Sequence, residues 1–180
     1  MHPKDIVKGA KVTGSKRTIA SALVAVTAML ALAGPAAAAS EAQRFTVLLG
    51  GDVDRVIAAG PVKGVGVLET DSHEFNPDDG SVVVANRFVF DGGTLLVTFR
   101  GQAQLEPVAT CVTRTAIDGT FEITGGTGIY EGARGGGTFI DRGVFVTRRT
   151  SDGCSDDGVF RAIIRATGTI TLPDGAERAA

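Results

Sequence analysis

The feature that most restricts how this chain can fold is a strict alternation of apolar and polar side chains near its C-terminal end. Between residues 159 and 172, apolar or small side chains occupy every second position, and Arg or Thr fills most positions between them. A period of two over this length is typical of a β-strand with one buried and one solvated face. Gly168 interrupts the apolar face, which indicates a bend or bulge where the strand curls around a barrel.

The same pattern recurs along the chain. Residues 81–90 and 94–100 are rich in Val, Phe and Leu, and the Asp91-Gly92-Gly93 turn between them predicts a β-hairpin. Many short strands separated by Gly-, Asp- and Asn-containing turns, with no helical period among them, predict an all-β sandwich or barrel. The absence of Trp disfavours an immunoglobulin-type sandwich. Further strands are predicted at residues 44–49, 53–58, 62–70, 108–117, 120–124 and 137–147.

Residues 1–39 are predicted to be a signal peptide. Five basic residues precede an apolar run over residues 19–34, which is too short to span a bilayer, and small residues including Ala37 and Ala39 precede a cleavage site ahead of Ser40. A membrane anchor with a flexible stalk is the alternative. We therefore expect a secreted, extracellular protein in which residues 40–180 form a single domain, with no membrane contact after the signal is removed.

The charge of residues 40–180 argues against nucleic acid as a partner. The first 39 residues hold five of the 18 basic residues and one of the 20 acidic residues, which leaves 13 basic and 19 acidic residues and a net charge of −6. Phosphate binding requires a basic surface, and no stripe of Lys and Arg with interleaved aromatic residues is present.

Cys111 and Cys154 are predicted to form a disulfide bond. They are the only two cysteines, both lie in the part expected to be exported, and an even number of cysteines pairs in an oxidising compartment. The alternative, a catalytic thiol, needs a nearby base, and His73 is the only histidine after residue 39.

The most informative segment is residues 123–135, which contain Thr124-Gly125-Gly126-Thr127-Gly128. A glycine-rich loop that binds a dinucleotide must be followed by a helix, whose N-terminal amides hold the pyrophosphate. Here the chain continues to Gly135-Gly136-Gly137, and a run of glycines does not propagate a helix. The sequence therefore predicts no nucleotide and no other cofactor.

This segment closely resembles the signature of the allene oxide cyclase family and, less closely, that of dirigent proteins. Tyr130, Glu131, Gly132 and Ala133 stand at matching positions of that signature. The resemblance implies an eight-stranded antiparallel β-barrel, closed as in lipocalins, with an apolar lumen open at one end. It also implies a small apolar ligand, assembly as a homotrimer, and, if the chain is an enzyme, a cyclase or isomerase that fixes the conformation of a reactive intermediate. The acidic residues of these families have no secure counterpart here, so the catalytic residues are unknown.

Four residues are candidates for the ligand pocket, namely Asn86, Tyr130, Glu131 and Arg134. Arg134 follows the glycine turn, and its guanidinium could bind an acidic or phenolic ligand; alternatively it anchors the turn through backbone carbonyls or Glu131. Tyr130 could line the lumen or plug one end of the barrel. Asn86 shares an otherwise apolar face with Val82, Val84, Phe88 and Phe90, and is either a ligand contact or a core amide with internal partners.

His73, with Asp71, Glu74 and the nearby Asp78 and Asp79, is a group whose residue types could bind a metal, and the carboxylates around Cys154 (Asp152, Asp156 and Asp157) are another, without the ligand spacing of a calcium loop. One histidine with loop carboxylates is more often a solvated turn, so no metal site is predicted. Two functions remain open. The chain is either a barrel that binds and orients a small ligand, or a non-catalytic structural or interaction protein whose barrel is filled by its own side chains.

Overall fold

A computed structural model describes residues 39–173, so the predicted signal peptide lies outside the described residues except for Ala39. The described part contains eight β-strands and no helix. The prediction of an all-β fold with eight antiparallel strands is therefore confirmed. The strands are β1 (Glu41–Leu49), β2 (Arg55–Ala59), β3 (Gly64–Phe75), β4 (Ser81–Phe90), β5 (Gly93–Ala109), β6 (Val112–Gly128), β7 (Arg134–Thr150) and β8 (Gly153–Thr171).

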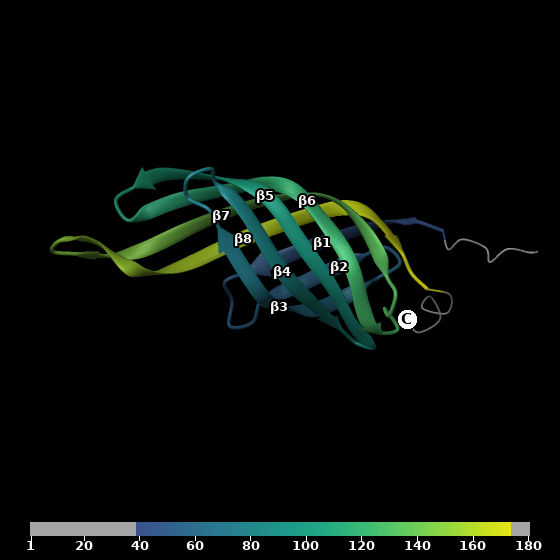
Figure 1. Cartoon of the computed structure of the whole chain (residues 1–180). Helices are drawn as coiled ribbons and strands as arrows, with labels where there is room; N and C mark the ends of the chain where they lie inside the picture. Colours follow the sequence, from purple (N-terminus) through teal and green to yellow (C-terminus); the bar gives the residue numbers. More distant parts are fainter. Residues whose placement is uncertain (1–38, 174–180) are drawn as a thin grey trace, which may run out of the picture. The chain divides into compact units, whose positions relative to one another are not determined.

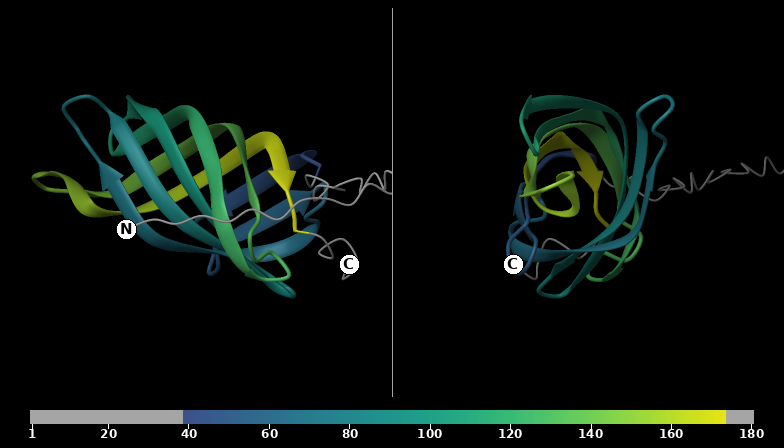
Figure 2. Two further views of the ribbon diagram at one scale, coloured as in Figure 1. Left: turned by 45° about the vertical axis from the view of Figure 1, so that its right-hand side comes forward. Right: turned by 90° about the vertical axis from the view of Figure 1, so that its left-hand side faces the viewer.

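The strands form one antiparallel sheet that closes on itself as a ring. Each strand pairs with the next along the chain, and β1 also pairs with β8. Leu48, for example, lies opposite Arg55 of β2 on one side and Ile163 of β8 on the other. Figure 1 shows the strands crossing one another obliquely, and the end-on view in Figure 2 shows them running around a common axis. Closure leaves no unpaired edge along these registers.

The alternation of side chains determines which face of each strand is buried. In β8, Ala162, Ile164, Ala166 and Ile170 are buried, and the alternate residues Ile163, Arg165, Thr167 and Thr169 are exposed. This confirms the period-two pattern predicted for that strand. The buried side chains point into the ring because a β-strand directs successive side chains to opposite faces.

Five phenylalanines fill the middle of the ring. Phe99 contacts the rings of Phe139 and Phe121, at centroid distances of 4.9 and 6.0 Å, and Phe45 contacts Phe88 at 5.3 Å. Further contacts of Phe45 with Phe121 and of Phe88 with Phe99 join the five rings into one cluster. Because the rings come from β1, β4, β5, β6 and β7, the cluster ties opposite sides of the sheet together.

Three strand predictions need correction. Residues 108–117 and 120–124 were predicted as separate strands, but β6 runs through both, and Val108 and Ala109 belong to β5. Asp118 and Gly119, which separate these two predicted strands, are instead part of a ladder in which Gly119 pairs with Gly101 and Phe139. Strand β3 was expected to end at Thr70, but it continues to Phe75 across a bulge between Thr70 and Ser72. His73 is therefore on a strand rather than in a turn.

The glycine-rich segment forms a corner between two strands, as predicted. Strand β6 ends at Gly128 and β7 begins at Arg134, with residues 129–133 forming a turn. The turn is closed by backbone hydrogen bonds from the N–H of Glu131 to the carbonyl of Gly128 and from Ala133 to Tyr130. No helix follows the glycines, so the helix that a dinucleotide-binding loop requires is absent from this segment.

The predicted disulfide bond between Cys111 and Cys154 is present, with the two Cα atoms 5.4 Å apart. Cys111 lies in the β5–β6 connection and Cys154 lies at the start of β8, so the bond joins the tips of the two longest hairpins. A disulfide is compatible with an extracellular location. Within residues 39–173, no helix is long and apolar enough to cross a membrane.

Candidate functional site

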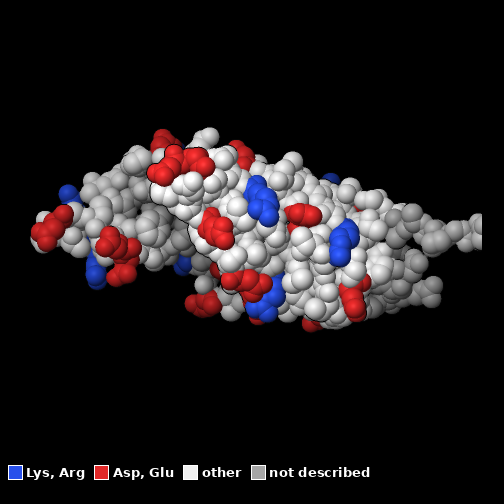
Figure 3. Space-filling view, viewed as in Figure 1, with Lys and Arg blue, Asp and Glu red and all other residues white. Residues whose placement is uncertain are grey.

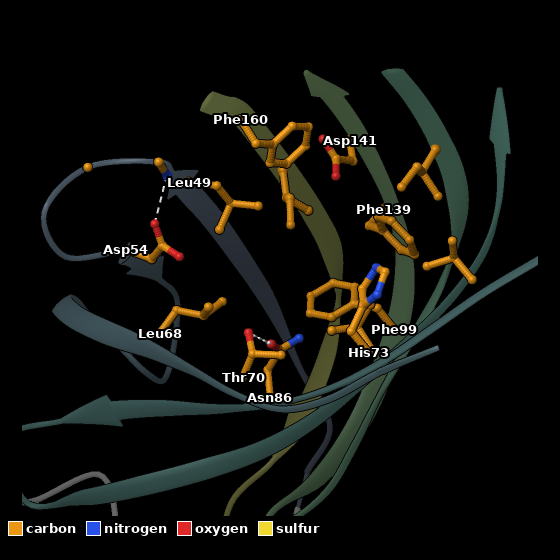
Figure 4. Close-up of a pocket in the computed structure, with 16 residues that line it drawn as sticks. Leu49, Asp54, Leu68, Thr70, His73, Asn86, Phe99, Phe139, Asp141 and Phe160 are labelled. Atoms are coloured by element: carbon orange, nitrogen blue, oxygen red, sulfur yellow. Dashed lines mark hydrogen bonds between the residues drawn. The ribbon is translucent and has the colours of Figure 1, made fainter. Parts of the chain in front are cut away.

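A cavity of about 540 Å³ lies inside the ring, toward the end where the β1–β2 and β3–β4 connections are found. Its wall is mostly apolar, and a few polar side chains project into the same space from different strands (Figure 4). The main apolar residues are Leu68, Val82, Val84, Phe99, Phe139 and Ile164. The polar side chains are those of Asp54, Thr70, His73, Asn86 and Asp141.

The phenylalanine cluster forms the floor of this cavity. Phe99 and Phe139 line the cavity and also belong to the cluster, with their rings in an edge-to-face contact. Phe45, Phe88 and Phe121 lie behind them and are at most 3% exposed. The middle of the ring is therefore filled by side chains, and the cavity occupies one end of it.

Asp141 is the most unusual residue of the cavity. It follows Phe139 by two positions on β7, so it points inward, and its neighbours on the inner face are Ile117 of β6 and Ile164 of β8. The residue is only 5% exposed, and its Oδ1 atom has no hydrogen-bond partner among the described residues. Burial raises the pKa of Asp141 to about 6, because removing water penalises the charged form, and the nearby Arg142 opposes this rise.

Arg142 does not pair with the carboxyl group of Asp141. It is the next residue on the strand, so its side chain points to the outside of the ring. There its Nη1 atom donates hydrogen bonds to Asp118 Oδ1 at 2.8 Å and to the backbone carbonyl of Asp141 at 2.7 Å. The inner carboxyl group and the outer guanidinium are thus separated by the sheet.

A second buried polar atom lies close to Asp141 in the strand register. The hydroxyl of Thr115 on β6 has no hydrogen-bond partner among the described residues, and Thr115 pairs with Gly143, two positions after Asp141. A side chain at position 143 would begin 2.6 Å from the Thr115 hydroxyl and 2.9 Å from the ring of Phe160. Glycine at this position leaves room for these two side chains on the inner face.

Asn86 projects into the cavity from β4, on the same inner face as Val82, Val84, Phe88 and Phe90. It is 6% exposed, and its Oδ1 atom accepts a hydrogen bond from the Thr70 hydroxyl at 2.9 Å. Its amide nitrogen points into the cavity (Figure 4). Asn86 therefore has one internal hydrogen-bond partner, as the core-amide interpretation expects, and one polar group directed into the cavity.

His73 reaches the cavity because of the bulge in β3. Thr70 pairs with Asn86, and after the bulge Ser72 and His73 pair with Ala85 and Val84. The extra residue, Asp71, is held outside the ring by Arg87, whose Nε donates to Asp71 Oδ1 at 2.8 Å. A regular strand would direct Ser72 inward, so the bulge is what brings His73 to the inner face.

Asp54 lies at the rim of the cavity, and its carboxyl group already accepts a hydrogen bond from the chain. Its Oδ1 atom accepts a hydrogen bond from the backbone N–H of Gly50 at 2.7 Å, which closes the β1–β2 connection. Within residues 39–173, no three His, Cys, Asp or Glu side chains are placed to hold a metal ion.

The other three predicted pocket residues lie at the opposite end of the ring, in or beside the β6–β7 turn. Tyr130 is buried against Phe90, with ring centroids 6.1 Å apart, and burial raises its pKa, with a further contribution from Asp91. Glu131 is exposed. Arg134 is also exposed, and its Nη1 donates to the carbonyl of Ala133 at 2.7 Å, which corresponds to the turn-anchoring alternative. None of the three lines the cavity.

Sequence reasoning missed Asp141, although the signal was present. Residues 137–147 were predicted as a strand, and a period of two places residues 137, 139, 141 and 143 on one face. A carboxylate between Phe139 and Gly143 on that face is a buried charge.

Comparisons of the chain with protein-family models, with curated proteins and with solved structures found no match.

Proposed function

We propose that this chain is a secreted β-barrel that holds a small apolar ligand in its lumen and fixes the ligand's conformation, as the resemblance to allene oxide cyclases and dirigent proteins implies. The cavity inside the closed sheet carries this proposal. A ligand pocket is typically about 300–1,000 Å³ in volume, mostly apolar, with a few placed polar groups. The cavity of about 540 Å³ matches that description.

The size of the cavity favours ligand binding over the alternative of a filled structural barrel. One water molecule occupies about 30 Å³ in the liquid, so the cavity of about 540 Å³ is far larger than a packing defect. A space with this much apolar wall, enclosed by Phe99, Phe139 and Ile164, gains free energy when an apolar molecule replaces water in it.

Asp141 is the group through which such a barrel could also act as an isomerase or cyclase. General acid–base catalysis is most efficient when the pKa of the catalytic group is near the working pH. Burial brings the pKa of Asp141 to about 6, and its carboxyl group faces the cavity. A ligand beside Asp141 could therefore exchange a proton with it near neutral pH, while the apolar wall excludes water from the reacting atoms.

The proposal is tested by titrating the purified protein with N-phenyl-1-naphthylamine, an uncharged apolar dye that fluoresces when it leaves water. We expect saturable binding that Val84→Trp weakens at least tenfold, because Val84 lines the cavity. Val83→Trp is the matched control, because Val83 is the preceding residue of β4 and lies on the outer face. Leu68→Phe provides a second, smaller filling of the cavity if Val84→Trp does not fold.

Absence of saturable binding by the wild-type protein, across this dye and a varied panel of apolar ligands, contradicts the proposal. Equal weakening by Val83→Trp and Val84→Trp also contradicts it, because the dye would then bind outside the lumen.

A further inference from the structure

We infer that the ligand of this cavity carries a protonated amine, which forms an ion pair with the carboxylate of Asp141. The inference rests on the proposed ligand-binding function and specifies the chemistry of the ligand. Its first support is that Asp141 lies on the cavity wall, is 5% exposed, and leaves Oδ1 without a partner among the described residues. Buried charges in proteins are normally paired, so an unpaired carboxylate facing a cavity indicates a partner from outside the chain.

No Lys or Arg among residues 39–173 lines the cavity to serve as that partner, and His73 is the one basic residue type on its wall. Arg142 is on the outer face and is engaged by Asp118. On the inner face, Asp141 is flanked by Ile117 and Ile164, which carry no charge. The titratable side chains that share the cavity with it are Asp54 and His73, and no Lys or Arg of residues 39–173 lines the cavity.

The rim of the cavity adds negative charge. The β1–β2 connection, residues 50–54, contains Asp52 and Asp54, and the β3–β4 connection, residues 76–80, contains Asp78 and Asp79; neither contains Lys or Arg. Figure 3 shows both acidic and basic side chains toward this end of the molecule. Charges of one sign around a low-dielectric opening raise the local concentration of the oppositely charged ligand. The guanidinium of Arg161 lies beside Gly50 at the same rim, so the four acidic side chains of the two connections outnumber this one cation and favour a cationic ligand over an anionic one.

The charge state of Asp141 distinguishes an amine from other polar ligands. At pH 7 a carboxyl group with a pKa of about 6 is mostly ionised. An ammonium group donates charge-assisted hydrogen bonds to a carboxylate, which are about twice as strong as neutral ones. An alcohol donates only a neutral hydroxyl, and a carboxylate ligand would place a second negative charge beside Asp141. The expected order of affinity is amine, then alcohol, then carboxylate.

The test uses three fluorescent ligands that share one ring system: 1-naphthylmethylamine, 1-naphthalenemethanol and 1-naphthoic acid. With wild-type protein at pH 7.5 and low salt, we expect the amine to bind about tenfold or more tightly than the alcohol, and the acid to bind most weakly. In Asp141→Asn, the amine and the alcohol should bind within about twofold of each other. Glu122→Gln is the matched control, because it removes one negative charge from an exposed position on the outer face of β6.

A second measurement needs no variant. Between pH 8 and pH 5 the amine and the acid keep their charges, so the affinity of the amine should fall as Asp141 is protonated, while that of the alcohol should change little. A preference for the amine that persists in Asp141→Asn, equal affinities of amine and alcohol for the wild type, or tightest binding of the acid each overturn the inference. If N-phenyl-1-naphthylamine binds in the cavity and the amine has no advantage, only this inference fails; if neither binds, the proposed function fails with it.

Discussion

Gln43 and Val62 exchange two hydrogen bonds across the end of the ring that is opposite the cavity. The Nε2 atom of Gln43 donates to the carbonyl of Val62, and its Oε1 atom accepts from the Val62 N–H, both at 3.0 Å. Both residues are 1% exposed. A single buried amide side chain therefore replaces the strand partner that the β2–β3 connection lacks.

Replacing this amide should destabilise the fold. In Gln43→Leu the N–H and the carbonyl of Val62 both lose their partner while remaining buried, and each unsatisfied group costs about 1–3 kcal/mol. We expect the free energy of unfolding, measured by urea titration, to fall by about 2–4 kcal/mol. Gln104→Leu is the control, because Gln104 is exposed on β5; it should change stability by about 0.5 kcal/mol or less. Equal effects of the two substitutions contradict this prediction.

Two adjacent glycines near the end of β6, Gly125 and Gly126, should respond differently to alanine. A Cβ atom at Gly126 would lie 2.5 Å from the Thr94 carbonyl and 2.6 Å from that of Tyr130, both backbone atoms. At Gly125 the nearest atom would be Nη1 of Arg134 at 3.2 Å, the end of a flexible side chain. We expect Gly126→Ala to lower the free energy of unfolding by about 2 kcal/mol or more, which a strongly lowered thermal midpoint would show. Gly125→Ala should change the midpoint little. The opposite order would show that the corner differs from the one described.

The pH dependence of stability should report the buried carboxyl group of Asp141. Its pKa is raised from 3.8 to about 6 in the folded protein, so the folded state holds this proton more tightly than the unfolded chain does. Stability from this group is therefore fully present below about pH 4 and is lost as the pH rises through 6, by at most about 3 kcal/mol. Arg142 on the outer face opposes the rise, and Asp54 and His73 are the other titratable side chains that line the cavity.

The measurement compares unfolding free energies of the wild type and Asp141→Asn between pH 4 and pH 8. The substitution should remove the loss of stability that titration of Asp141 causes. The unfolding free energy of the variant should therefore increase relative to that of the wild type as the pH rises. Glu122→Gln should follow the wild-type curve in shape. A constant difference between wild type and Asp141→Asn over this range would show that the carboxyl group titrates normally.

The disulfide bond should contribute substantially to stability. It links residues 43 positions apart, and in the chain-entropy model a loop of this length contributes about 3–4 kcal/mol. We expect dithiothreitol to lower the urea midpoint of the wild type to that of the Cys111→Ser/Cys154→Ser double variant, which should itself be insensitive to the reductant. Because the bond joins hairpin tips rather than lining the cavity, dye binding should survive below the unfolding transition. A wild-type midpoint unaffected by reductant contradicts the prediction.

Local patterns explain how much of the fold was predictable. Alternation in β8, the Asp91-Gly92-Gly93 turn and the glycine corner each depend on neighbouring residues, and all three were predicted from the sequence. The continuity of β6 through Asp118-Gly119 was not, because Gly119 is required by close approach to the backbone of Arg100, a residue of the adjacent strand. A glycine in a turn and a glycine beneath another strand have the same local signature.

The candidate site was only partly predictable for a related reason. Asn86 was found because its strand pattern was clear, and the cavity does contain it. Tyr130, Glu131 and Arg134 were selected from a motif that the structure places at the other end of the ring. Which end contains the cavity depends on the positions of the phenylalanine rings from five strands, and no local pattern encodes that arrangement.

The bulge at Asp71 is held from the outer face of the sheet, and it determines which side chains of β3 face the lumen. Arg87 contacts both Asp71 and Glu69 from the outer face, at 2.8 and 3.2 Å. If the strand were regular, Ser72 and Glu74 would face inward in place of His73 and Phe75, and the lumen would acquire a further carboxylate. The side chains that β3 presents to the lumen after Thr70 are therefore determined by where the strand places one extra residue, and not by the inward-facing residues alone.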